Sequence, residues 1–218
     1  MKPILFNTDM VKAILDGRKT VTRRIIKPQP GVDEELLYIY AAGRKSDIGK
    51  WQSRIPGRKW TPPYHAEDIL YVRETWRIRN VFGDWNRCDR SAEIEFLAGG
   101  TNITLHNITR RFEDWRKGAR WLPSIHMPRT AARIFLRVDC VRVERLQDIT
   151  ADECPMEGVW PLAACTVGER DTYDRSKFAE LWDSTIKPAD LDKYGWAANP
   201  WVWVIKFERC KRPEVDGL

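Results

Sequence analysis

The sequence lacks long apolar runs, and this absence bears on membrane association. A membrane-spanning helix needs about 20 consecutive apolar residues, and the longest apolar candidate, residues 201–205, has only the length of a strand. Residues 1–9 do not have the apolar core and cleavage site of a secretory signal peptide. We therefore predict a cytoplasmic protein that does not enter a membrane.

Cysteine and histidine are also scarce. The five cysteines are odd in number and include no C-x-x-C spacing, which argues against a disulfide framework and against a zinc ribbon. The three histidines, His65, His106 and His126, lie far apart and form no H-E-x-x-H motif. We predict reduced thiols, no metal site and no cofactor.

Common catalytic and nucleotide-binding motifs are missing as well. The chain has no glycine-rich phosphate loop of the G-x-x-x-x-G-K-[ST] or G-x-G-x-x-G type, and no G-x-S-x-G motif. These absences disfavour the usual modes of nucleotide phosphate binding and the α/β-hydrolase fold.

The charge balance points to a polyanionic partner. The 218 residues include 37 Lys and Arg against 31 Asp and Glu, a formal net charge of +6, within a composition typical of globular proteins. Basic side chains bind phosphates by displacing counterions. Some of the 11 tryptophans adjoin arginines, as in the pairs at 76–77, 115–116 and 120–121. Bases of single strands stack on such rings, although tryptophans also fill the cores of β-rich domains.

Hydrophobic periodicity predicts an α+β fold in a single domain over residues 1–218. Residues 31–66 are expected to form a long insertion, and residues 77–125 an irregular region. The expected helices cover 9–16, 150–158 and 175–184, and the expected strands cover 20–26, 68–76, 92–96, 133–146 and 200–207. The sequence pattern alone does not distinguish a closed barrel from an open sheet.

Local signals place the ends of these elements. Asn7 or Thr8 is expected to cap the first helix, with Gly17 as its left-handed stop. The T-x-x-E pattern at 150–153 is a capping box, and Asp174 is expected to cap the last helix. A change of apolar phase within 133–146 predicts a bulge near residues 139–140.

A polar corner after the first helix is the strongest candidate site. Residues 17–24 read GRKTVTRR, so Lys19 and Thr22 emerge where a helix turns into a strand. A threonine hydroxyl needs a base to become a nucleophile, and a lysine can be that base because burial lowers its pKa. The alternative is a solvated basic corner with β-forming threonines.

Three segments together resemble the ASCH domain family of the PUA-like superfamily: GRKTVTRR (17–24), EDILYV (67–72) and WVWVIKF (201–207). HMPR (126–129) and NPWVW (199–203) are similar to the long phage- and prophage-type members. The resemblance covers most of the chain except 31–66 and 77–125. It implies a small β-barrel with short helices plugging its ends, in a superfamily that binds RNA or modified bases in a cleft.

One shorter ASCH branch hydrolyses N4-acetylcytidine with a lysine, a threonine and a glutamate, and the resemblance places these on Lys19, Thr22 and Glu157. It implies that Lys19 accepts the proton of Thr22, that Thr22 attacks the amide carbonyl, and that Glu157 protonates or orients the leaving amine. Strict strand alternation would put Thr20, Thr22 and Arg24 on one face and Lys19 on the other. Lys19 can therefore join Thr22 only if the strand begins after Lys19.

Three hypotheses follow. The first is a PUA-like module that binds RNA or a modified nucleobase in a basic, aromatic-lined cleft. The second is an amidohydrolase of an N4-acylated cytidine, or another nucleoside-processing hydrolase, that uses Lys19, Thr22 and Glu157. The third is a phage structural or interaction protein. The candidate ligand-binding residues are Arg18, Thr20, Arg24, Tyr71, Arg73, Trp76 and Arg129. Partly exposed rings are expected among Tyr71, Trp76, Trp121 and Trp160.

Overall fold

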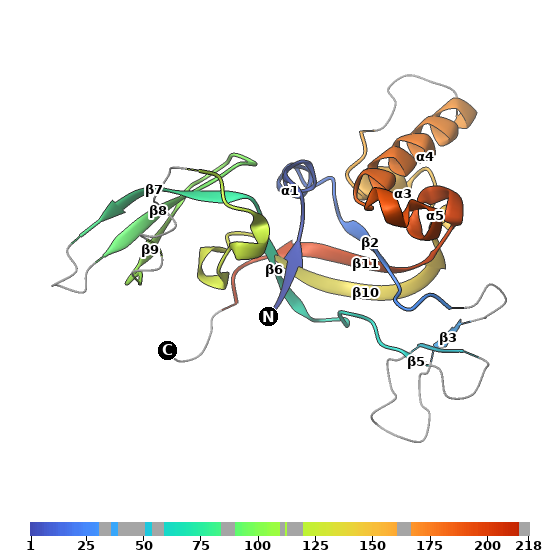
Figure 1. The fold of residues 1–218 in the computed structure, drawn as a ribbon, viewed down its shortest axis with the longest axis horizontal. Coiled ribbons are helices and arrows are strands. Elements are labelled where there is room, and N and C mark those ends of the chain that lie inside the picture. The colour runs from blue at the N-terminus through green and yellow to red at the C-terminus, as the bar shows by residue number, and fades with distance from the viewer. Residues whose placement is uncertain are drawn as a thin grey trace. The chain divides into compact units, whose positions relative to one another are not determined.

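The computed structural model describes residues 1–30, 36–38, 51–53, 59–83, 90–109, 112, 120–160 and 167–213 (Figure 1). Backbone contacts divide the chain into two compact units. Unit 1 comprises the described parts of 1–17, 69–137 and 209–218, and unit 2 those of 18–68 and 138–208. Most of the expected insertion at 31–66, and the Trp115–Arg116 pair, lie outside the described residues. The single ASCH-type domain therefore stays a prediction.

The described part of unit 1 combines helices with strands of two sheets. Its elements are β1 (Lys2–Leu5), α1 (Thr8–Leu15), β6 (Ile69–Arg73), β7 (Trp76–Phe82), β8 (Ser91–Phe96), β9 (Ile103–His106), the 3-10 helices η3 (Ser124–His126) and η4 (Arg129–Ala131), and the start of β10 (Phe135–Arg145). β1 pairs in parallel with β6, and β6 pairs in an antiparallel sense with β10. β7, β8 and β9 form an antiparallel meander.

Helix α1 forms because both of its ends are satisfied locally. Asn7 Oδ1 accepts a hydrogen bond from the backbone N–H of Met10 at 2.8 Å, and Gly17 follows the helix with a φ of 76°. Val11, Ala13 and Ile14 are its buried residues. The helix predicted over 9–16, with Asn7 as one of the two proposed caps, is confirmed.

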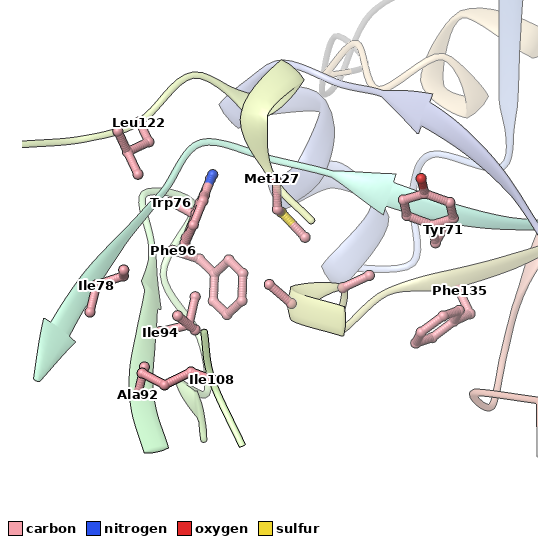
Figure 2. Close-up of a cluster of buried hydrophobic side chains, with 12 residues drawn as sticks. Tyr71, Trp76, Ile78, Ala92, Ile94, Phe96, Ile108, Leu122, Met127 and Phe135 are labelled. Atoms are coloured by element: carbon pink, nitrogen blue, oxygen red, sulfur yellow. The ribbon is translucent and has the colours of Figure 1, made fainter. Parts of the chain in front are cut away.

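The core of unit 1 is built around Trp76. Figure 2 shows Trp76 beside Phe96 and Met127, with Leu122, Ile78 and Ile94 nearby, and Tyr71 and Phe135 farther along β6 and β10. Trp76 is fully buried and Tyr71 is 7% exposed. The expected exposure of these two rings is therefore wrong: they serve as apolar packing, since burying large aromatic surface stabilises the fold.

Unit 2 combines the rest of the five-stranded sheet with helices. Its elements are β2 (Val21–Ile25), β3 (Leu36–Tyr38), β4 (Trp51–Ser53), β5 (Lys59–Trp60), most of β10, η5 (Leu146–Asp148), α3 (Glu153–Met156), α4 (Val167–Ser184), η6 (Pro188–Asp190), α5 (Leu191–Tyr194), η7 (Trp196–Ala198) and most of β11 (Trp201–Cys210). β11 pairs in an antiparallel sense with β2, and β3, β4 and β5 form a small antiparallel sheet.

The helices of unit 2 pack on the β2–β11 pair, as Figure 1 shows for α3, α4 and α5. Phe178 and Trp182 of α4 share one buried apolar cluster with Val21 of β2 and with Val202 and Val204 of β11. This packing fixes the end of α3 against the start of β2, where the candidate site lies.

The structure confirms a mixed α and β chain. The strand order of the large sheet is β1-β6-β10-β11-β2, with β1 and β2 at its two ends, so the sheet does not close among the described strands. The PUA-like barrel therefore stays a prediction, as does the bulge near residues 139–140.

Two of the expected element boundaries are wrong. Helix α4 begins at Val167, and Asp174, the expected cap, lies inside it, fully buried and 3.4 Å from Arg170 Nε. The strand expected over 68–76 is divided, because β6 ends at Arg73 and β7 begins at Trp76.

Candidate functional site

At the polar corner of residues 17–24, the strand begins after Lys19, as a contact between Lys19 and Thr22 would require. β2 begins at Val21, so Lys19 and Thr20 precede the strand and are free of its alternation. The backbone N–H of Thr20 donates to Met156 O, and Thr20 O accepts from the backbone N–H of Phe207, both at 2.9 Å. The corner is thus held between α3 and β11.

Lys19 and Glu157 form a buried ion pair. Lys19 Nζ lies 2.8 Å from Glu157 Oε2, and the lysine side chain has no exposed surface. The same Nζ donates to the backbone carbonyls of Glu157 at 2.7 Å and Val21 at 2.9 Å. These three acceptors match the three N–H groups of an ammonium ion. Two predicted site residues, separated by 138 positions in the sequence, are therefore in direct contact.

Arg23 extends this pair into a larger ion-pair cluster. Its Nη1 lies 3.1 Å from Glu157 Oε1, and its Nη2 lies 2.6 Å from Glu153 Oε2 and 3.2 Å from Glu144 Oε2. Arg142 forms ion pairs with Glu144 and Glu153 from the more exposed side. We refer to this group as the ion-pair cluster, whose members are Lys19, Arg23, Arg142, Glu144, Glu153 and Glu157.

Sequence reasoning missed Arg23. The motif at 17–24 shows an arginine at this position, but its three carboxylate partners lie on other elements, more than 120 positions away. The strand alternation does contain a usable signal, because it places Arg23 on the same face as the core residue Val21. A charge on an apolar face requires a partner.

Burial and neighbouring charges set the proton affinity of Lys19. Burial lowers the pKa of Lys19, as does the positive charge of Arg24 and Arg23, while Glu157 raises it; the net direction is down. Burial also lowers the pKa of Arg24, against the influence of Tyr64 and Glu157. A lysine with a lowered pKa is more readily neutral, and a neutral amine can accept a proton.

Thr22 is buried within β2. By strand alternation it lies on the face of β2 opposite Arg23, and it pairs in register with Ile205. Lys19 Nζ contacts the carbonyl of the peptide group that joins Val21 to Thr22. The lysine ammonium and the Thr22 backbone are therefore neighbours.

An exposed aromatic ring lies close in the sequence to Glu157 and contacts the residue before Lys19. Trp160 is 69% exposed, and the Arg18 guanidinium carbon lies 3.9 Å from the centre of its ring. Arg18 Nη1 also donates to Gly158 O at 3.2 Å. Met156 is 40% exposed. We call Arg18, Met156 and Trp160 the stacking platform. Arg18 adjoins Lys19 and Met156 adjoins Glu157 in the sequence, and Trp160 follows Glu157 by three residues.

The other predicted ligand-binding residues belong to unit 1. Arg73 donates to Ile125 O at 3.2 Å, and its guanidinium carbon lies 5.6 Å from the ring of the buried Tyr71. Trp76 is core, and Arg129 is exposed in η4. Arg18, Thr20 and Arg24 remain with Lys19 in unit 2. The residues that contact one another around Lys19 thus all come from unit 2.

The described residues contain no group of three or more His, Cys, Asp or Glu side chains that could hold a metal ion. They also include no helix of the length and apolarity needed to cross a membrane.

Comparison with protein-family models, with curated proteins and with solved structures found no match to the chain. The ASCH resemblance therefore remains a prediction from the sequence motifs.

Proposed function

We propose that the protein binds a nucleobase, free or presented by single-stranded RNA, at the stacking platform. The observation that supports this proposal is the exposed Trp160 ring with the Arg18 guanidinium 3.9 Å from its centre. Proteins that bind single strands use aromatic rings for bases and nearby cations for the backbone. The resemblance to the ASCH family supports the same class of ligand.

Charge around the platform favours an anionic ligand. The chain has a formal net charge of +6, and residues 17–24 contribute four basic side chains. Three of these lie within or beside the buried site, and Arg18 contacts the exposed ring. We propose that Arg24, one of the predicted ligand-binding residues, contacts a phosphate of the ligand.

The first test compares two tryptophans that are each stacked by an arginine. Base stacking contributes about 1–3 kcal/mol, so Trp160→Ala should weaken binding of a short single-stranded RNA and of N4-acetylcytidine by roughly 5- to 150-fold. Trp121 is the matched control, because Arg77 lies 4.5 Å from its ring in unit 1. Binding is measured by fluorescence anisotropy for the RNA and by calorimetry for the nucleoside. Equal losses in Trp160→Ala and Trp121→Ala, or no loss in either, would contradict the proposal.

A second candidate function is amide hydrolysis on an N4-acylated cytidine. The contact of 2.8 Å between Lys19 and Glu157, together with the lowered pKa of Lys19, favours it. The two N–H groups of a neutral Lys19 can bind the carbonyls of Val21 and Glu157, and its lone pair can accept the Thr22 proton.

The chemistry balances without a cofactor. Thr22 Oγ attacks the acyl carbonyl as its proton passes to Lys19, and the C–N bond breaks as the exocyclic amine of cytosine takes a proton from Lys19 or Glu157. Water then hydrolyses the ester on Thr22, which releases the carboxylic acid and restores the hydroxyl.

The second test follows release of cytidine from N4-acetylcytidine by chromatography. Lys19→Met and Thr22→Val should each reduce kcat by at least about 100-fold, since general base and nucleophile are lost. Trp160→Ala should mainly raise KM. Turnover that persists in Thr22→Val would exclude Thr22 as the nucleophile. If the folded wild-type protein shows no turnover, hydrolysis is excluded and only the binding function remains.

A further inference from the structure

Arg23 is a buried cation in an unusual setting. It lies on the face of β2 that packs with Phe178 and Trp182, and its side chain has no exposed surface. A charge in such an apolar environment is costly unless partners surround it. The planar guanidinium of arginine suits several carboxylates at once better than the ammonium of lysine does.

The contacts of Arg23 fix the orientation of Glu157. One oxygen of this carboxylate lies 3.1 Å from Arg23 Nη1, and the other lies 2.8 Å from Lys19 Nζ. The second nitrogen of the guanidinium is bound by Glu153 and Glu144, so Arg23 is itself held in place. The Glu157 carboxylate therefore has one cation on each oxygen.

We propose that Arg23 is the positioning residue of this site: by holding one oxygen of Glu157 and leaving the other to Lys19, it controls whether Lys19 carries a proton. This inference rests on the proposed function for the role of Lys19 as a proton acceptor. It assigns a role to a residue that the sequence motif alone did not single out.

The charge of Arg23 acts on Lys19 in two ways. It repels the ammonium directly, which lowers the pKa of Lys19 together with burial, the largest influence, and with Arg24. Arg23 also binds Glu157, whose negative charge raises the pKa of Lys19. Both effects of Arg23 act against the protonated form of Lys19. A Lys19 that has lost its proton can accept one from Thr22 or from a bound base.

The test measures the titration of Lys19 in the intact 218-residue chain. NMR spectra of protein with labelled lysine side chains are recorded against pH, and the Lys19 signal is assigned by its absence in Lys19→Arg. Arg23→Met should raise the pKa of Lys19, because a neighbouring positive charge is removed while Glu157 remains. Arg23→Lys should return the pKa toward the wild-type value, because the charge is restored.

Arg142→Met is the matched control. Arg142 belongs to the same ion-pair cluster, but its carboxylate partners are Glu144 and Glu153, and it does not bind Glu157. Its removal should leave the titration of Lys19 unchanged. An unchanged Lys19 pKa in folded Arg23→Met, or an equal shift in Arg142→Met, would overturn the proposal. A purely structural role for Arg23 would lower the melting temperature without moving this titration.

A double variant keeps the test decisive if Arg23→Met does not fold. Arg23→Met/Glu153→Gln removes one cation and one of its carboxylate partners together, and it is compared with Glu153→Gln alone, so that the difference reports Arg23. Binding of N4-acetylcytidine is measured in parallel. Absence of binding in every variant, with the Lys19 shift intact, would refute the proposed function and leave the role of Arg23 standing. Binding without the shift would refute the role of Arg23.

Discussion

A buried ion pair such as Lys19–Glu157 does not by itself make a fold more stable. Removing two charges from water costs several kcal/mol per ion, and replacing such a pair by apolar residues is often neutral or stabilising. Loss of one partner, in contrast, leaves an uncompensated charge. Residues with perturbed proton affinity in such settings are frequent at functional sites.

The lowered pKa of Lys19 predicts a specific dependence of stability on pH. The unfolded chain keeps its lysine proton up to the ordinary pKa of 10.5, whereas the folded state loses that proton at lower pH. Between the two values the unfolded state binds more protons, so the free energy of unfolding rises with pH in this window. Urea unfolding of the wild type and of Lys19→Met over this range should show the rise only in the wild type.

Loss of the Lys19 side chain should also destabilise the fold. Lys19→Met should lower the free energy of unfolding by about 3 kcal/mol near neutral pH, because Glu157 loses one of its two cations inside the protein. The same pH slope in both proteins would mean that Lys19 titrates as an exposed lysine does.

Sequence reasoning identified part of this site. Lys19, Thr22 and Glu157 could be named because a local motif and a family resemblance point to them, and the Lys19–Glu157 contact is now observed. Arg23 and its partners Glu144 and Glu153 could not be found in this way. Ion pairs between distant elements depend on how a sheet and a helix pack, and periodicity does not record such packing.

At the scale of the elements, local capping separates the successful predictions from the others. Helix α1 was placed correctly because Asn7 and Gly17 specify its ends within a few residues. The start of α4 was missed because its first turns are polar and lack an apolar period, so Asp174 looked like a cap. In the fold Asp174 is interior and pairs with Arg170 one turn earlier.

Short strands were missed for a related reason. β1 and β9 each have four residues, too few for alternation to stand out from chance. β1 is specified by its parallel pairing with β6, a contact between residues near 2–5 and near 70–73. The break between β6 and β7 also depends on tertiary contacts, since Trp76 pairs with Leu122 and packs in the same core cluster as Met127.

For the molecule as a whole, hydrophobic periodicity predicted a mixed α and β chain, and this is observed. The division into two compact units depends on contacts between distant segments, such as 1–17 with 69–137, which periodicity does not record. Four of the seven predicted ligand-binding residues, Tyr71, Arg73, Trp76 and Arg129, consequently fall in the unit that does not contain Lys19.

The net charge of +6 provides a measurement that distinguishes stacking from phosphate contact. For single strands, each neutralised phosphate adds about 0.7 to the slope of log affinity against log salt concentration. Arg18→Met should reduce this slope by roughly that amount for a short RNA, because a cation is lost. Trp160→Ala should weaken binding at every salt concentration and leave the slope unchanged, because a ring releases no counterions. Arg129→Met, an exposed change in unit 1, should alter neither quantity. A slope that falls with Arg129→Met and not with Arg18→Met would move the RNA-binding surface from the stacking platform to unit 1.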